Sequence, residues 1–354
     1  MESLYSSDPV VIFAFRLGIA VAAMTVVMLF VIIIMRQVVL RRERIHANAV
    51  AFWKDYIVSS PDHVGDTIPV LLNRDVDGFL EVWNRVHEPL RGATTPHLAR
   101  VARESGLEKH LHKRLNKSTF HSQLLVIIAM GHVQNKENFH LIEPFILDEN
   151  PIVSLCAARA LMQIDSSRAV SKFVPQIASR EDWPQGSIAT ILHEGSTEAL
   201  SKELSQATIQ ANAEIAPRLI RFLADVSPQS AAPIIRDTIL TSPDDKLVST
   251  CLQVMANSDD LDCVRPLLAH PRWHVRMQAA VTLGRLGVPG DEQYLSALLS
   301  DEQWWVRYRA AQALLKLSFI NNDDMYRIQQ TQKDGFARDI IDHVMAEKAM
   351  GLAA

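Results

Sequence analysis

Histidine is the side chain in this sequence best suited to metal binding or proton transfer near neutral pH. There are thirteen histidines, and the stretch KHLHKRL places His110 and His112 two residues apart. On a helix this spacing turns the two side chains about 200° from each other, so they make poor co-ligands. His121, His132 and His140 have no acidic residue or cysteine at the spacing of a metal ligand set. We therefore expect no metal site and no cofactor.

Paired acidic residues and cysteines are the next candidates for chemistry. Asp259-Asp260 and Asp323-Asp324 fall in expected loops, where carboxylates typically cap helices, whereas a glycosidase pair needs a cleft. Cys156, Cys251 and Cys263 lack CxxC spacing, which is typical of buried thiols in a reducing compartment. The sequence also contains no nucleophile elbow, phosphate-binding loop or dinucleotide-binding glycine motif. We expect no catalytic residues.

Tryptophan and arginine are placed regularly in two nearly identical stretches. HPRWHVRMQAAVTLGRL begins at His270, and DEQWWVRYRAAQALLKL begins at Asp301, 31 residues later. The tryptophans stand just before each apolar run, where they either cover the seam between repeats or anchor a partner, since Trp and Arg dominate interface hot spots. The arginines could also pair with acids in neighbouring repeats. The candidate partner-binding residues are Trp273, Trp304, Trp305, Arg276 and Arg307.

The same stretches contain a helical repeat. A large apolar residue is followed by small or apolar residues at +4 and +5 and an apolar residue at +8, which is one face of an α-helix. This pattern recurs seven times at a spacing of 28 to 33 residues. The matching sets begin at Phe120, Val153, Trp183, Ile215, Leu247, Val275 and Val306, the earliest being Phe120, Leu124, Leu125 and Ile128.

A second apolar helix is expected between successive matches. Examples are NFHLIEPFIL (138–147), LDCVRPLL (261–268) and DEQYLSALL (291–299), separated from the first helices by turn residues. One helix pair cannot bury its apolar face alone, but a stack of pairs can. The sequence therefore predicts an all-α fold: an α-solenoid of about seven helix pairs over residues 120–320, closed by a helical cap at 321–354.

The repeats resemble the HEAT-like family, in particular the short-repeat subtype found in phycobilin lyases. VRMQAAVTLGRLG and VRYRAAQALLKL carry the resemblance, which extends over roughly Phe120 to Leu317. The family implies an α-solenoid that mostly binds other proteins; a minority of members assist enzymes or modify bound chromophores.

Residues 10–35 are predicted to form a transmembrane helix. Leu17 to Met35 is a run of 19 residues without a charge, about the length that a bilayer core requires. The run is too long for a signal peptide, and no small-residue cleavage site follows it. Arg16 is expected either to snorkel to the headgroups or to pair with an acidic residue on a partner's membrane helix.

Charge sets the expected orientation. Residues 1–9 contain no Lys or Arg, whereas four arginines follow the span, so the positive-inside rule predicts an outer N-terminal tail and a cytoplasmic solenoid at the inner membrane. Residues 36–119 are read as a basic helical cap that contacts anionic lipid; a solvated helix face is the alternative. Nucleic-acid binding is not expected, given the net charge of −4. The candidate lipid-contacting residues are Arg36, Arg41, Arg42, Arg44, Arg100, Arg103, Lys109, Lys113 and Arg114.

The layout is also similar to bacterial inner-membrane HEAT-repeat proteins encoded beside family-2 membrane glycosyltransferases. The stretches in question are FLEVWNRVHEPLRG, the basic helix after it and WWVRYRAAQALLKL. This resemblance implies a non-catalytic accessory subunit for exopolysaccharide synthesis or export. The alternatives are a lyase-like protein that modifies or chaperones a bound ligand, and a signalling scaffold.

Overall fold

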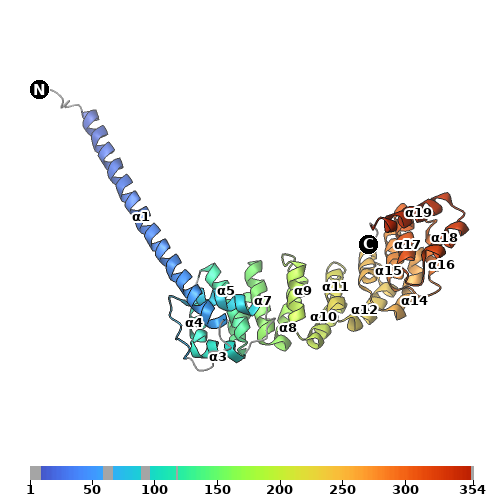
Figure 1. Ribbon diagram of the computed structural model, residues 1–354, viewed down its shortest axis with the longest axis horizontal. Coiled ribbons are helices and arrows are strands. Elements are labelled where there is room, and N and C mark those ends of the chain that lie inside the picture. Colours follow the sequence, from blue (N-terminus) through green and yellow to red (C-terminus); the bar gives the residue numbers. More distant parts are fainter. Residues whose placement is uncertain (1–8, 59–66, 89–95, 117–118, 352–354) are drawn as a thin grey trace. The chain divides into compact units, whose positions relative to one another are not determined.

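A computed structural model describes residues 9–58, 67–88, 96–116 and 119–351 (Figure 1). Over these residues the secondary structure is helical throughout and contains no strand, which confirms the predicted all-α, solenoid-type fold. The chain forms two compact units, Met1–Asn135 and Lys136–Ala354.

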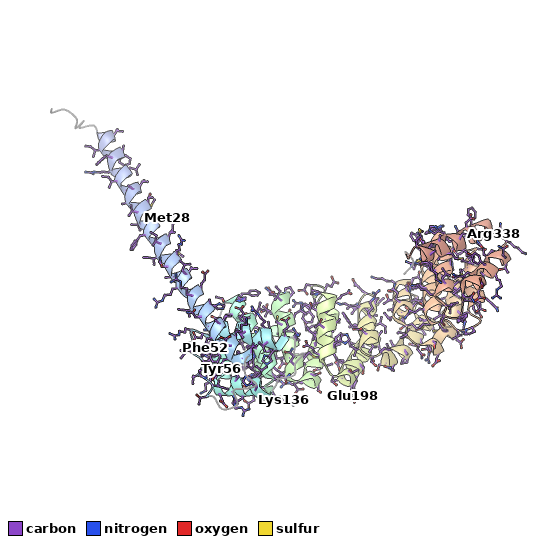
Figure 2. The ribbon with its side chains drawn as sticks, viewed as in Figure 1. Met28, Phe52, Tyr56, Lys136, Glu198 and Arg338 are labelled. Atoms are coloured by element: carbon purple, nitrogen blue, oxygen red, sulfur yellow. The ribbon has the colours of Figure 1, made fainter. Side chains whose placement is uncertain are left out.

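The first unit is built on one very long helix. Its helices are α1 (Pro9–Val58), α2 (Val76–His87), α3 (Pro96–Glu104), α4 (Leu107–Leu115) and α5 (Phe120–Val133). The part of α1 that carries Met28 is exposed all round, while Phe52 and Tyr56 lie at its packed end (Figure 2). The predicted apolar segment is thus the exposed half of a continuous 50-residue helix.

The other half of α1 belongs to the core of the first unit. Ala49, Trp53 and Ile57 follow one another at the i, i+4 spacing of a single helix face, and all three are buried. The Trp53 ring meets the Phe79 ring of α2 edge-on, with 4.8 Å between centroids. A Cβ at Gly78 would lie 2.8 Å from the Cβ of Ala49, so this glycine permits the close approach of α1 and α2.

The second unit is a row of helix pairs, in which each pair contacts the next along the chain (Figure 1). The first helices of the pairs are α7 (Pro151–Ile164), α9 (Gln185–Glu194), α11 (Ala216–Val226), α13 (Asp245–Val254), α15 (Trp273–Leu286) and α17 (Trp304–Lys316). The intervening helices are α8 (Ser166–Ser179), α10 (Thr197–Gln210), α12 (Pro228–Thr241) and α16 (Glu292–Leu298), and the last pair ends with α18 (Asn322–Thr331) and α19 (Gly335–Ala349).

The predicted skeleton forms the core of this unit. In α15 and α17 all eight skeleton residues have no exposed surface, and the Ala pair at +4 and +5 is also fully buried in α7. Small residues bring the helices close together: a Cβ on Gly284 would lie 2.5 Å from Ala313 of the next repeat. Close backbone approach is therefore what the small positions provide.

Two of the expected second helices are broken into short pieces. Residues 136–147 form η2 (Lys136–Asn138), α6 (Phe139–Ile142) and η3 (Glu143–Leu147), and residues 258–269 form η4 (Ser258–Asp260), α14 (Leu261–Val264) and η5 (Arg265–Ala269). Pro144 and Pro266 stand at the start of η3 and η5. Proline lacks the N–H that would continue the α-helical ladder, so each helix tightens to 3₁₀ at that point.

The register predicted for the earliest repeat is wrong by two residues. Phe120 is 49 % exposed, and the buried positions of α5 at the same spacing are Ser122, Val126, Ile127 and Met130. The α5 helix packs on α2 and α4 of the first unit, and the Ser122 hydroxyl donates to Asp77 Oδ1 at 3.0 Å. A polar residue thus occupies the first core position, where the pattern calls for an apolar one.

Candidate partner-binding site

The strongest candidate for partner binding is a group of aromatic side chains on α15, α17 and α19, which we call the aromatic patch. It consists of Trp304, Trp305, Tyr308 and Phe336, together with Trp273, which begins the neighbouring helix α15. The exposed fractions are 39 % for Trp273, 43 % for Trp304, 52 % for Trp305 and 70 % for Phe336. None of the three tryptophans is fully buried, so each presents part of its ring to a partner while the rest contacts its own repeat.

The rings at the start of α17 hold one another in place. Trp304 stacks on Tyr308 one turn later, with centroids 5.0 Å apart and planes 9° apart. Trp305 meets Trp304 edge-on at 4.8 Å, which are preferred geometries for aromatic pairs. The Tyr308 hydroxyl donates to Glu347 Oε2 at 2.8 Å, and its partial burial together with this carboxylate raises the pKa of Tyr308. These large rings are therefore already ordered before any partner binds.

A small hollow lies between α17 and α19 beside the patch. Its volume is about 310 Å³, and its lining residues are Trp304, Arg307, Phe336, Asp339, Ile340 and His343. Apolar rings at the centre and charged groups around them are the usual anatomy of an interface. The hollow could accept one large side chain of a partner.

Arg276 and Arg307 form hydrogen bonds with the turns that precede α15 and α17. Arg276 Nε and Nη2 donate to the two carboxylate oxygens of Asp301 at 2.7 and 2.9 Å, and its Nη1 donates to the carbonyl of His270 at 2.8 Å. Arg307 Nη1 donates to the carbonyls of Asp301 and Glu302. Both guanidinium groups therefore hold the turns that precede Trp273 and Trp304, and Arg307 also lines the hollow beside the patch.

Similar arginine–aspartate pairs recur along the second unit. Arg236 Nε donates to Asp260 Oδ1 at 2.6 Å, and Arg265 Nε donates to Asp291 Oδ1 at 2.8 Å. The partners are 24 and 26 residues apart, against 25 for Arg276 and Asp301. Arg276 thus forms the ion pair with a neighbouring repeat that the sequence suggested, whereas Arg307 donates to backbone carbonyls instead of an acidic side chain. The pairs of Arg236 and Arg265 were missed, although their near-constant spacing was an available signal.

A polar groove on the first helices was also missed. Its volume is about 800 Å³, and it crosses α9, α11, α13 and α15. On the α15 side of the groove, the Nε2 atoms of His270 and His274 each lie 3.7 Å from a carboxylate oxygen of Asp245. Its lining residues include Arg218, Arg221, Asp244, Asp245, Gln253 and His274. These side chains are exposed or partly buried and lie outside the apolar skeleton of the repeat, which leaves their residue types free.

The basic residues predicted to contact lipid lie in the first unit. On α1, the residues of this set, Arg36, Arg41, Arg42 and Arg44, are all exposed, and so is Arg16, the candidate for a contact within the membrane. Arg103, Lys109 and Lys113 are exposed on α3 and α4, while Arg100 is partly buried. Arg114 is also partly buried; it forms an ion pair with Asp77 and donates to the carbonyl of Asn73. The structure brings two of these residues, Arg42 and Arg114, to the rim of one cavity.

The histidines, acidic residues and cysteines considered for chemistry are either scattered over the structure or buried. Within the described ranges, no three His, Cys, Asp or Glu side chains are grouped to hold a metal ion. Burial raises the pKa of Cys251 to about 12, and it raises that of Cys156 and Cys263 as well. These thiols are therefore protonated at neutral pH and poor nucleophiles.

Comparison with known proteins identifies one part of the chain. Residues 233–315 match the family model for HEAT repeats. The crystal structure of Kap121p is similar over 85 % of this chain, at 10 % identity and a TM-score of 0.44, and the chain spans 39 % of that protein's length. No curated protein sequence matches the chain. The HEAT match contains α15 and all of α17 except its last residue, so Trp273, Trp304 and Trp305 lie within it.

Proposed function

We propose that this protein is a membrane-anchored, non-catalytic scaffold that binds a protein partner through the aromatic patch. The observation that carries the proposal is the exposure of four large rings, on Trp273, Trp304, Trp305 and Phe336, on rigid helices. Exposed apolar groups gathered in one place and rimmed by charges mark interaction sites, and tryptophan is among the commonest hot-spot residues. HEAT repeats in this part of the chain agree with a binding role.

The exposed half of α1 supports membrane anchoring. It has the length and hydropathy to cross a bilayer, and it is the one helix of this kind among the described residues. A cleaved signal sequence fits poorly, because the same helix continues into the core of the first unit at Ala49, Trp53 and Ile57. From the arginines after the apolar stretch and the positive-inside rule, we infer that this end of the helix, and with it the solenoid, lies in the cytoplasm.

We further propose that the partner is a membrane glycosyltransferase of family 2, and that the protein is an accessory subunit for exopolysaccharide synthesis or export at the bacterial inner membrane. The support is the resemblance in residues 79–92 and 304–317, together with an anchor that keeps the scaffold beside a membrane enzyme. In this role the chain contributes binding and position, and its partner contributes the sugar chemistry.

The proposal is tested by purifying the full-length protein in mild detergent and identifying bound proteins by mass spectrometry. The variant Trp304→Ala/Trp305→Ala removes two rings from the patch. The matched control Tyr294→Ala/Tyr326→Ala removes two exposed rings elsewhere, since these side chains are 48 % and 53 % exposed. Equal melting temperatures would establish that both variants fold.

We expect a membrane glycosyltransferase to be recovered with the wild type and the control, and to be lost with the tryptophan variant. A partner that all three proteins retain would leave the scaffold role intact but remove the patch from it. Recovery of no specific partner would contradict the scaffold role and favour a ligand-modifying protein.

A further inference from the structure

The first unit contains a cavity that lies between α1, just after its apolar stretch, and two other segments of the same unit. Its volume is about 570 Å³. Its lining residues are Arg42, Glu43, Ile45 and His46 from α1, Asn73, Arg74 and Asp77 from the segment around the start of α2, and Arg114 from α4. We propose that this cavity binds the phosphate headgroup of an anionic phospholipid, an inference that rests on the proposed membrane anchoring.

Helix geometry directs Arg42 into the cavity. Arg42, His46, Ala49 and Trp53 follow at spacings of four, three and four residues, which is one face of a helix. Ala49 and Trp53 are buried in the core of the first unit, so Arg42 continues the packed face beyond its buried end. Arg41 is turned about 100° away and does not line the cavity.

The charges around the cavity leave cationic groups available to a phosphate. Arg114 is held by an ion pair with Asp77 and by the carbonyl of Asn73 at 2.7 Å. Arg74 Nε lies 3.6 Å from Asp75 Oδ1, which is too far for a hydrogen bond, and 70 % of the Arg74 side chain is exposed. Arg42 forms no ion pair with any residue that the structure describes. The lining contains three arginines and two carboxylates, those of Glu43 and Asp77. One guanidinium group can donate two parallel hydrogen bonds to two oxygens of a phosphate.

The position along α1 suits a headgroup. Arg42 is seven residues beyond Met35, the end of the uncharged run, which is about 10 Å along a helix. The headgroup layer of one leaflet extends roughly 5 to 7 Å beyond the hydrocarbon core. Side chains on an α-helix lean toward its N-terminus, which here is the membrane side, so the Arg42 guanidinium can reach the phosphate layer.

A bound site differs from diffuse attraction in one measurable way. Diffuse attraction depends on the number of cations near the surface, so Arg41 and Arg42 would contribute equally. A site depends on which cations line it, so Arg42 and Arg74 matter and Arg41 does not. The test therefore compares Arg42→Gln and Arg74→Gln with Arg41→Gln, which makes the same charge change on the same helix.

The full-length protein in detergent micelles would be titrated with phosphatidylglycerol or phosphatidylcholine, and bound lipid counted by native mass spectrometry. We expect one tightly bound phosphatidylglycerol and no equivalent phosphatidylcholine. Arg42→Gln and Arg74→Gln should each weaken this binding roughly tenfold, as expected for the loss of one charge-assisted hydrogen bond to the phosphate. Arg41→Gln should change it less than twofold.

Equal weakening by Arg41→Gln and Arg42→Gln would overturn the site in favour of diffuse attraction, and so would the absence of a one-to-one lipid complex. Displacement of phosphatidylglycerol by an equal concentration of inorganic phosphate would overturn the assignment to a lipid. Alkaline extraction of membranes tests the proposed membrane anchor independently of the proposed headgroup site. A protein that resists extraction but binds no lipid here loses only the headgroup site.

Discussion

The Asp301 side chain connects the two most similar copies of the repeat in this chain and stabilises the turn before the aromatic patch. Its carboxylate accepts both hydrogen bonds from Arg276 in the preceding repeat, and its Oδ1 also accepts the N–H of Gln303 at 2.9 Å. Its carbonyl accepts a hydrogen bond from Arg307. Only 8 % of the Asp301 side chain and 14 % of the Arg276 side chain are exposed, so solvent screens this pair weakly.

We predict that Asp301→Asn destabilises the protein by about 3 kcal/mol, because it leaves the Arg276 charge buried without its anion. Urea denaturation of the full-length protein, followed by circular dichroism, measures this loss. The control is Asp262→Asn, whose carboxylate pairs with Arg265 but is 92 % exposed, and which should cost less than about 1 kcal/mol. Equal losses in the two variants would contradict a structural role for the Arg276–Asp301 pair.

The same pair predicts a pH dependence. Burial raises the pKa of Asp301, but the hydrogen bonds from Arg276 and the Gln303 N–H outweigh it and hold the pKa below its ordinary value. The unfolded chain therefore binds the proton more tightly, so the stabilisation is complete above pH of about 4 and is lost as pH falls below it. We expect the stability difference between wild type and Asp301→Asn to shrink between pH 6 and pH 2; a constant difference would contradict this.

Sequence reasoning at the residue scale found the tryptophans but not their exposure. A tryptophan just before the apolar face of a helix can turn toward the seam or away from it, and residue spacing does not distinguish the two. Arg276 and Arg307 were read as candidates for an interface, and their bonds to neighbouring turns depend on loop conformations that follow from the stacking of the repeats.

At the scale of helices, small residues determine how closely the repeats approach. Gly284 of α15 faces Ala313 of α17, and a Cβ on Gly284 would overlap both the backbone and the side chain of Ala313. The spacing of these two helices also fixes the position of Trp304 relative to Trp273, since each tryptophan begins one of them. The geometry of the aromatic patch is therefore tied to this contact.

We predict that Gly284→Ala destabilises the protein by roughly 1 to 3 kcal/mol, as overpacking of a tight core does. Gly335→Ala is the control, because nothing lies within 4 Å of a Cβ at that position on the first turn of α19. Thermal melts of the two variants beside the wild type would decide this. A Gly284→Ala protein as stable as the control would show that α15 and α17 separate easily.

The repeat pattern predicted the first helices well because apolar and small residues at fixed spacing are direct requirements of helix packing. The earliest helix was misread because bulky Phe120 matched the pattern better than Ser122, whose hydroxyl is satisfied by Asp77 from a distant part of the sequence. The boundaries proposed between the basic segment, the repeats and the terminal cap remain predictions. The structure groups α5 with the first unit, which ends at Asn135.

At the scale of the whole molecule, α1 links the proposed membrane span to a folded unit without a flexible linker. The distance from Met35 to Ala49, the first buried residue of α1, is fourteen residues, or about 21 Å of helix. The arginines that follow the apolar stretch occupy this interval. A continuous helix would keep the first unit at a set height above the bilayer, which suits a scaffold for a membrane partner.

We predict that the full-length protein stays in the membrane pellet after alkaline carbonate extraction, because a transmembrane helix buries far more apolar surface than an interfacial contact. A cysteine introduced at Gln37 should react with a membrane-impermeant maleimide only after the cytoplasmic side is opened. Release by carbonate would contradict the anchor, and labelling from outside intact cells would reverse the proposed orientation.

The most direct test of the central claim is a photo-crosslink from the aromatic patch in living cells. A benzophenone amino acid would replace Trp305 in the full-length protein, and Glu198 on α10, which is exposed and outside the patch, would serve as the control position. We predict one discrete crosslinked membrane protein from position 305, identified by mass spectrometry, and none from position 198. The same crosslinks from both positions, or none from position 305, would contradict the claim that the aromatic patch binds a partner.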